Sequence, residues 1–157
     1  MRIAILTISD AGSRGERADT SGDAAAAWAG DRLVARAIVA DDTVSIVRHL
    51  IEWCDDDKAD LVITTGGTGL APRDVTPEAT RSVIEREAPG IAERIRYATG
   101  LTFPRAALGR GVAGIRASTL IVNLPGSTSA VQESLAVLEP ILDHAVKILR
   151  GEHTEHS

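Results

Sequence analysis

The chain has very few aromatic residues: among its 157 residues, only Trp28, Trp53, Tyr97 and Phe103 are aromatic. Proteins that bind single-stranded nucleic acid stack the bases on several exposed aromatic side chains, and this chain does not supply such a platform. Hydrophobic residues make up 44% of the sequence, which is enough for a packed core and excludes a wholly disordered chain. We therefore expect a core built mainly of Val, Ile, Leu and Ala.

Cysteine, positive charge and long apolar runs are scarce as well. The single cysteine, Cys54, excludes an internal disulfide and a cysteine-rich zinc site. Acidic residues outnumber basic ones by 22 to 17 and the net charge is −5, so no nucleic-acid partner attracted by bulk charge is expected. No apolar run approaches the roughly 20 residues of a membrane span, and the N-terminal stretch becomes polar too soon for a signal peptide. We expect a cytoplasmic protein with no membrane segment.

The length suits one domain over residues 1–157, because domains typically have about 100–200 residues. Apolar runs predict buried strands at 3–8, 37–40, 61–64, 112–116 and 119–123. Helical spacing or helix-start signals predict helices at 24–34, 43–54, from 76, at 91–98 and from 129. Residues 11–22 contain glycines and charges and are interpreted as a long mobile loop. Strands that alternate with helices indicate an α/β domain with a mostly parallel sheet.

Several helix boundaries can be predicted from capping residues. Asp42 or Thr43 is a plausible N-cap of the second helix, and Pro77 fits the first position of the third. Ser129 and Gln132 form a capping-box pattern for the last helical region, which Pro140 is expected to kink or restart. Gly151 is expected to end that region, with residues 151–157 as a frayed tail.

Unusual residues follow four of the predicted strands. In open α/β sheets, ligands bind beyond the carboxyl ends of the strands. The four segments are Ser9-Asp10, Asp41-Asp42, Thr65–Gly69 and Asn123–Ser127. Each alone is also consistent with an ordinary turn, but four of them at one edge of a sheet favour a binding site.

Two of these segments have the composition of anion cradles. Gly66, Gly67, Thr68 and Gly69 allow backbone N–H groups to converge on an anion without obstruction by side chains. The loop is not a Walker A motif, because no Lys-Ser or Lys-Thr pair follows, and its spacing does not fit the dinucleotide fingerprint. The second cradle, Pro125-Gly126-Ser127, precedes a helix N-terminus, where anions are favoured. Two cradles indicate two substrates, or one substrate with two phosphorylated parts.

Carboxylates close to these cradles would repel phosphates unless a cation lies between them. Asp41 and Asp74 are therefore candidate ligands of Mg²⁺, which prefers oxygen donors. A structural interpretation stays open for each, since Asp41 or Asp42 could cap a helix and Asp74 could be a turn residue. Arg73 could pair with a phosphate in a forked geometry or lie on the surface.

Residues 65–79, TGGTGLAPRDVTPEA, resemble the signature of the molybdopterin adenylyltransferase family of molybdenum cofactor biosynthesis, which includes the G domain of gephyrin. The resemblance extends to TISD at 7–10, DTSG at 19–22, EAPG at 87–90, AGIRASTLIVNLPGS at 113–127 and LEPILDHAVKIL at 138–149. It implies a three-layer α/β domain, usually assembled as a trimer. It also implies transfer of AMP from Mg-ATP to the terminal phosphate of molybdopterin, with release of pyrophosphate.

The resemblance assigns roles to residues of this chain. Asp41 and Asp74 correspond to the acidic residues that the family uses in catalysis. The resemblance implies that they bind Mg²⁺ and that the substrates are ATP and molybdopterin. The remaining expected substrate-binding residues come from the four strand ends and the signature: Ser9, Asp10, Gly66, Gly67, Thr68, Gly69, Arg73, Thr76, Pro125, Gly126 and Ser127. Two departures from the family pattern are Ala40, where Pro is frequent, and Gly109, where many members have Ser.

Two alternatives follow from the same observations. A member of this family could bind molybdopterin as a non-catalytic scaffold, with other molybdenum cofactor biosynthesis proteins as partners. A phospho-acceptor receiver domain also carries acidic residues after its first strand, but it needs an Asp at the end of the third strand and a Lys at the end of the last. Thr64-Thr65 and Asn123 stand at those ends instead.

Overall fold

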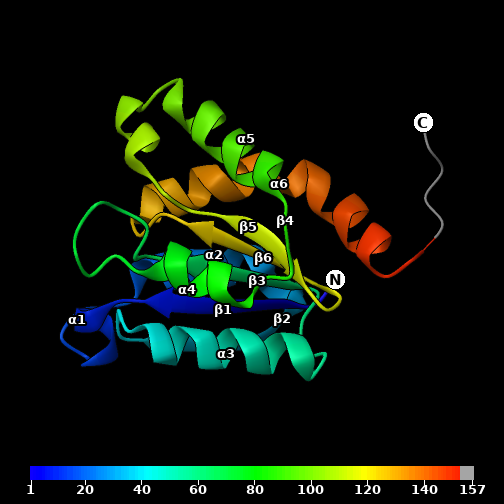
Figure 1. Cartoon of the computed structure of the whole chain (residues 1–157). Coiled ribbons are helices and arrows are strands. Elements are labelled where there is room, and N and C mark those ends of the chain that lie inside the picture. Colours follow the sequence, from blue (N-terminus) through cyan, green and yellow to red (C-terminus); the bar gives the residue numbers. More distant parts are fainter. Residues whose placement is uncertain (153–157) are drawn as a thin grey trace.

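The structure is a computed structural model that describes residues 1–152, and its centre is a six-stranded mixed sheet (Figure 1). The strand order is β2 (Leu33–Val39), β1 (Ile3–Ile8), β3 (Leu61–Thr65), β6 (Thr119–Leu124), β5 (Ala113–Arg116) and β4 (Arg86–Glu87). The first four strands are parallel to one another, and β5 and β4 run antiparallel to their neighbours. The expected α/β class with a mostly parallel sheet is confirmed.

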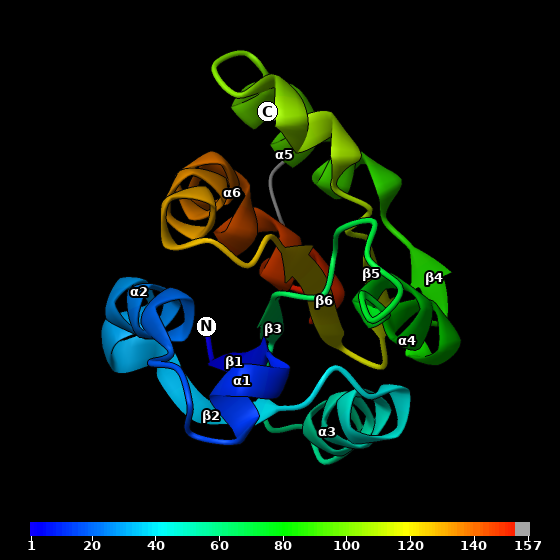
Figure 2. The same ribbon diagram turned by 90° about the vertical axis from the view of Figure 1, so that its left-hand side faces the viewer.

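Helices cover both faces of this sheet, so the domain has three layers (Figure 2). One face packs against α2 (Thr20–Ala29), α5 (Pro89–Gly100) and α6 (Thr128–Leu149), and the other against α3 (Thr43–Asp55) and α4 (Thr76–Val83). Alternate residues of β1 serve the two layers, since Ile3 and Ile5 face the first cluster and Ala4 and Leu6 the second. This explains why the central strands are continuous apolar runs. Within residues 1–152, no helix is both long and apolar enough to cross a membrane.

The interpretation of residues 11–22 as one long loop is wrong. Asp10–Ser13 form a short helix, α1, because the Ser9 hydroxyl accepts a hydrogen bond from the Gly12 amide. Helix α2 begins at Thr20, because the Asp19 carboxylate accepts a hydrogen bond from the Gly22 amide. Both side chains act as N-caps and satisfy amide groups that the first turn leaves free.

The boundaries around β2 also differ from the prediction. The helix expected over 24–34 ends at Ala29, where Gly30 takes a positive φ of 55°. A 3₁₀ turn, Gly30–Arg32, then leads into β2 at Leu33, four residues before the strand expected at 37–40. Every second residue of β2 from Val34 to Ile38 is exposed, as on an edge strand. Leu33 and Val34 continue the apolar residues of the preceding helix, and such a run does not by itself distinguish the end of a helix from the start of a strand.

The starts of α3 and α6 and the path of α6 through Pro140 decide three further boundary predictions. Asp42, and not Thr43, caps α3 by accepting a hydrogen bond from the Ser45 amide. Helix α6 is capped by Ser127, so the predicted capping box of Ser129 and Gln132 is wrong. The same helix continues through Pro140 without a restart.

The segment between α4 and β5 contains more regular structure than the sequence predicts. Helix α5 begins at Pro89 and not at 91, while β4 and the 3₁₀ helix η2 (Pro104–Leu108) were not predicted. Gly151 follows α6 with φ 70°, as expected for a helix end. Of the expected tail at 151–157, Gly151 and Glu152 donate hydrogen bonds to carbonyls of the last turn of α6, and the rest lies outside the described residues.

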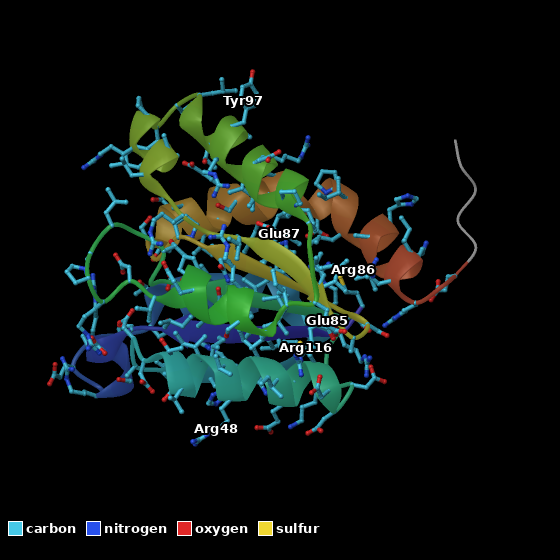
Figure 3. The ribbon with its side chains drawn as sticks, viewed as in Figure 1. Arg48, Glu85, Arg86, Glu87, Tyr97 and Arg116 are labelled. Atoms are coloured by element: carbon cyan, nitrogen blue, oxygen red, sulfur yellow. The ribbon has the colours of Figure 1, made fainter. Side chains whose placement is uncertain are left out.

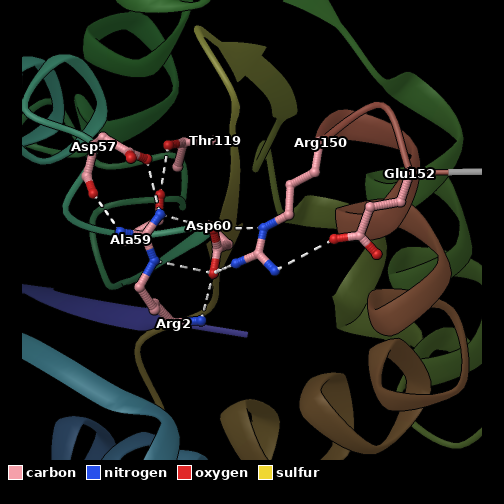
Figure 4. A network of polar contacts seen from close by, with 7 residues as sticks. All are labelled: Arg2, Asp57, Ala59, Asp60, Thr119, Arg150 and Glu152. Atoms are coloured by element: carbon pink, nitrogen blue, oxygen red, sulfur yellow. Dashed lines mark hydrogen bonds and ion pairs between the residues drawn. The ribbon is translucent and has the colours of Figure 1, made fainter.

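The N-terminus and the end of α6 meet at one buried carboxylate, Asp60, which precedes β3 (Figure 4). The Arg2 amide donates to Asp60 Oδ2 at 2.6 Å, and both Arg2 and Arg150 form ion pairs with this carboxylate. Burial alone would raise the pKa of Asp60, but the hydrogen bonds from Arg2 and Arg150 outweigh it and hold the pKa well below its usual range. This network fixes the amino end of the sheet, opposite to the edge that carries the site.

Candidate functional site

A cavity of about 470 Å³ lies at the carboxyl ends of the parallel strands. All four strand ends singled out in the sequence reach it. Its lining comes from the strand ends, the loops that follow them and the N-termini of α2 and α6: Thr7, Ile8, Ser9, Gly12, Arg17, Ala18, Asp19, Thr20, Ser21, Asp41, Thr65, Gly66, Gly67, Asp74, Gly126, Ser127 and Thr128. The parallel topology therefore gathers these segments at one edge, as open α/β sheets do.

The glycine loop can form only because two of its residues lack a side chain. Gly66 and Gly67 have φ values of 96° and 67°, in the region that glycine enters without steric cost. A Cβ at Gly66 would overlap the Ile8 carbonyl, and one at Gly67 would overlap the Thr76 hydroxyl. The Gly66 amide already donates to the Leu124 carbonyl at 3.2 Å, so this amide does not contribute to the predicted anion cradle.

Thr76 stabilises the glycine loop through two hydrogen bonds and does not line the cavity. Its hydroxyl donates to the Gly66 carbonyl at 2.9 Å and its amide to the Gly67 carbonyl at 3.1 Å. The side chain is fully buried. In the structure Thr76 therefore stabilises the glycine loop from the first turn of α4, and its contact with a substrate stays a prediction.

Three more residues of the predicted cradles lie beside the cavity and not in its wall. Thr68 and Pro125 line a small separate cavity of about 30 Å³. The carbonyl of Gly69 accepts a hydrogen bond from Arg110 at 2.8 Å. Of the two cradles, the residues in the main cavity wall are Gly66, Gly67, Gly126 and Ser127.

Asp41 and Asp10 are joined by a reciprocal pair of hydrogen bonds. The Asp10 amide donates to Asp41 Oδ2 at 2.9 Å, and the Asp41 amide donates to Asp10 Oδ1 at 3.0 Å. Burial is the main reason that the pKa of Asp41 is raised, and the negative charges of Asp10 and Asp74 add to it. Since Asp42 caps α3, Asp41 is left to line the cavity.

Asp74 reaches the same cavity from the loop between β3 and α4. Its Oδ2 accepts a hydrogen bond from the Ala71 amide at 3.0 Å, so it is also the turn residue that the sequence allowed. Both interpretations of Asp74 hold together. The negative charge of Asp74 adds to the raised pKa of Asp41, and both carboxylates line the same cavity.

Arg73 does not line the cavity; it binds a neighbouring carboxylate. Its Nε and Nη2 contact the two oxygens of Asp10 at 2.6 and 2.9 Å, and Nη2 also donates to the Asp41 carbonyl at 3.1 Å. The hydrogen bonds from Arg73 hold the pKa of Asp10 below its usual value. The forked geometry predicted for a phosphate is thus used on Asp10, and it links the loops after β1, β2 and β3.

The sequence interpretation missed the contribution of the segment before α2. Within residues 1–152, Arg17 is the only basic residue that lines the cavity. The Asp19 carboxylate caps α2, accepts a hydrogen bond from Thr7 and pairs with Arg36 at 2.9 Å. The DTSG stretch at 19–22 could have indicated the start of α2, because Asp is one of the residues preferred at the N-cap of a helix.

The two helix N-termini in the cavity wall are linked to each other. The hydroxyl of Thr128, at the start of α6, donates to the hydroxyl of Thr20, at the start of α2, at 2.9 Å. Each helix presents the positive end of its dipole at this edge. Together they favour anionic groups in the cavity.

Asp41 and Asp74 could supply two ligands of a magnesium ion that takes its other ligands from phosphates and water. In the part of the chain that the structure describes, no group of three His, Cys, Asp or Glu side chains could hold a metal. Mg²⁺ in nucleotide enzymes commonly uses one or two carboxylates together with substrate phosphates and water. A Cβ at Gly67 would lie 3.1 Å from Asp41 Oδ1, and one at Gly69 would lie 2.8 Å from Asp74 Oδ2. The glycines thus keep the space beside both carboxylates open.

The fold and this site define an α/β protein with an anion-favouring cavity at the carboxyl ends of its parallel strands, and comparison with known proteins identifies the family. Residues 4–144 match the family described as probable molybdopterin binding domain, and the chain belongs to that family. It is similar to molybdopterin adenylyltransferase of Helicobacter pylori, with 38% identity over 99% of this chain and 91% of that protein.

The chain is also similar to part of a longer protein and to a solved structure of nearly the same length. The chain is 41% identical to the molybdenum cofactor synthesis protein cinnamon of Drosophila melanogaster, over 92% of this chain but only 25% of that longer protein. Among solved structures, the molybdopterin biosynthesis enzyme MoaB of Thermus thermophilus superposes with a TM-score of 0.90 and 47% identity, over 96% of this chain and 97% of that one. The three-layer fold expected from the family resemblance is confirmed.

Proposed function

We propose that this protein is a molybdopterin adenylyltransferase of molybdenum cofactor biosynthesis, which transfers AMP from Mg-ATP to molybdopterin and releases pyrophosphate. The observation that carries the proposal is the presence of Asp41 and Asp74 in one cavity wall with the glycine loop and two helix N-termini. Similarity to the H. pylori adenylyltransferase over 91% of its length supports the choice of reaction.

The reaction joins two polyanions, so positioning and charge neutralisation dominate it. A terminal phosphate oxygen of molybdopterin forms a bond to the α-phosphorus of ATP, and the bond from that phosphorus to the oxygen bridging to the β-phosphate breaks. Pyrophosphate leaves with the electron pair of that bond. No general base is required, because the attacking phosphate is already ionised.

The protein groups take distinct parts in this scheme. Asp41 and Asp74 would hold Mg²⁺, which when bound neutralises the phosphates of ATP and the departing pyrophosphate. The N-termini of α2 and α6, with Ser127 at the latter, would bind phosphate oxygens. Arg17 would supply the positive side chain that we first expected from Arg73, because Arg73 is held by Asp10.

A direct assay tests the proposal. The purified protein is incubated with molybdopterin, ATP and Mg²⁺, and both adenylylated molybdopterin and pyrophosphate are measured. Formation of both products in equal amounts supports the adenylyltransferase. Binding of molybdopterin without turnover would contradict it and favour the scaffold alternative.

We also propose that the protein works as a cytoplasmic homotrimer alongside other molybdenum cofactor biosynthesis proteins. Four apolar side chains on or after α5, namely Tyr97, Leu101, Phe103 and Leu108, are exposed, and Figure 3 shows Tyr97 pointing outward from α5. Exposed apolar side chains that gather in one region support self-association. Light scattering coupled to size exclusion tests this, and a mass near 16.5 kDa would contradict it.

A further inference from the structure

Arg110 lies between η2 and β5, outside the wall of the main cavity, yet it holds both ends of the segment that carries Asp74. Its Nε donates to the Gly69 carbonyl at 2.8 Å, and its Nη2 donates to the Asp74 carbonyl at 2.7 Å. Its own amide donates to the Thr68 carbonyl at 2.8 Å. One residue thus fastens three points of the loop between β3 and α4.

The guanidinium of Arg110 is itself held by Glu78, in the first turn of α4. Nη1 and Nη2 both contact the Glu78 carboxylate. The hydrogen bond from Arg110 keeps the pKa of Glu78 below its usual value, so the pair stays charged near neutral pH. A planar guanidinium can serve a carboxylate and two carbonyls at once, which the single ammonium of lysine cannot do.

We propose that Arg110 is a positioning residue for Asp74. It fixes the backbone at Gly69 and Asp74, and this places the Asp74 carboxylate at the cavity wall beside Gly69. The effect on catalysis rests on the proposed function, in which Asp74 acts on the ATP phosphates. The effect on the loop does not, and it can be measured without substrate.

A second arginine of the same chain provides a matched control. Arg116, at the other end of β5 (Figure 3), contacts both oxygens of Asp55 at 2.9 and 2.8 Å and donates to the Val83 carbonyl at 2.9 Å. Arg110 and Arg116 therefore form the same kind of contacts, a carboxylate and backbone carbonyls. Only Arg110 forms them with the loop that bears Asp74.

The first experiment measures steady-state kinetics of the Arg110→Lys and Arg116→Lys variants. We expect Arg110→Lys to lower kcat by about 10- to 100-fold, the scale for displacing a catalytic group by a fraction of an ångström to 1 Å, with a KM for ATP within about two-fold of wild type. Arg116→Lys is expected to keep the wild-type kcat. Equal kcat values for the two variants, or a loss confined to KM, would overturn the positioning role.

The second experiment measures hydrogen exchange of backbone amides in the protein without substrate. The Ala71 amide donates to the Asp74 carboxylate and the Asp74 amide donates to the Ala71 carbonyl, so both report where Asp74 lies. We expect both amides to exchange faster in Arg110→Lys and to be unchanged in Arg116→Lys. Unchanged protection in Arg110→Lys would overturn the inference.

The two experiments separate the two proposals. If the wild-type protein shows no adenylyl transfer, the proposed function fails, and exchange at Ala71 and Asp74 still decides the role of Arg110. If Arg110→Lys does not fold, Glu78→Gln weakens the same guanidinium contact more mildly. It is expected to change kcat and Ala71 exchange in the same direction, and no change in either would count against the inference.

Discussion

Removal of the two cavity carboxylates is the sharpest test of the proposed metal-bridging role. In Asp74→Asn, the amide oxygen can still accept the hydrogen bond from the Ala71 amide, so the turn is expected to survive. In Asp41→Asn, the amide oxygen can likewise keep the bond from the Asp10 amide. Each substitution therefore removes a charge and leaves the local hydrogen bonds in place.

The expected loss can be estimated from charge stabilisation in other active sites. Removing one preorganised group that stabilises transition-state charge costs about 10²–10³-fold in kcat, or about 3–4 kcal/mol. We expect each single variant to lose at least about 100-fold. If both carboxylates act through one shared cation, the double variant loses little more than the worse single one, because residues that act as a unit are not additive.

Asp42→Asn is the matched control, because Asp42 stands beside Asp41 but only caps α3. It is expected to keep wild-type kcat and to cost at most about 1 kcal/mol of stability, since Asn is also a good N-cap. The assays are product formation at saturating ATP and thermal melting. A folded Asp74→Asn with near wild-type turnover, or fully additive losses in the double variant, would refute the shared-cation reasoning.

Three further predictions concern the loop, the missed cation and the buried carboxylate. Gly67→Ala is expected to lower the melting temperature and the turnover more than Gly15→Ala. Both glycines have positive φ, but only at Gly67 would the new Cβ meet Thr76 and Asp41. Equal effects of the two substitutions would contradict this. Arg17→Ala is expected to raise the KM for ATP by about 10-fold or more, the worth of a charged hydrogen bond, and an unchanged KM would remove Arg17 from the site. The depressed pKa of Asp60 contributes stability that is present above about pH 4 and lost as pH falls below it. Urea unfolding of Asp60→Asn should accordingly show lower stability at pH 7 and a weaker loss toward pH 3, and parallel pH curves for variant and wild type would be inconsistent with this.

The location of the site could be predicted from the sequence because it depends on topology. The central strands are apolar on both faces, so their ends are easy to find, and parallel strands must bring those ends to one edge. The sequence therefore predicts Ser9, Asp41, Gly66 and Gly126 at one edge of the sheet, and all four line one cavity.

The partners of individual side chains could not be predicted in the same way. Arg73 and Asp10 are 63 positions apart, and nothing in either local sequence shows that they pair. The start of α2 was missed because glycine and charged residues are typical of loops, although here Asp19 caps a helix. Arg110 stands outside the recognised motif, and only the folded chain brings it to Gly69 and Asp74.

The charge balance of the cavity gives a further reason to prefer a shared cation to a simple anion cradle. Asp19 is already paired with Arg36, which leaves Asp41 and Asp74 as the cavity carboxylates that no ion pair in residues 1–152 neutralises. Arg17 alone cannot offset them and also compensate the phosphates of two substrates. Two helix N-termini contribute only about half a charge each. A divalent cation held by Asp41 and Asp74 would supply the missing positive charge, and the glycines at 67 and 69 leave space beside the two carboxylates.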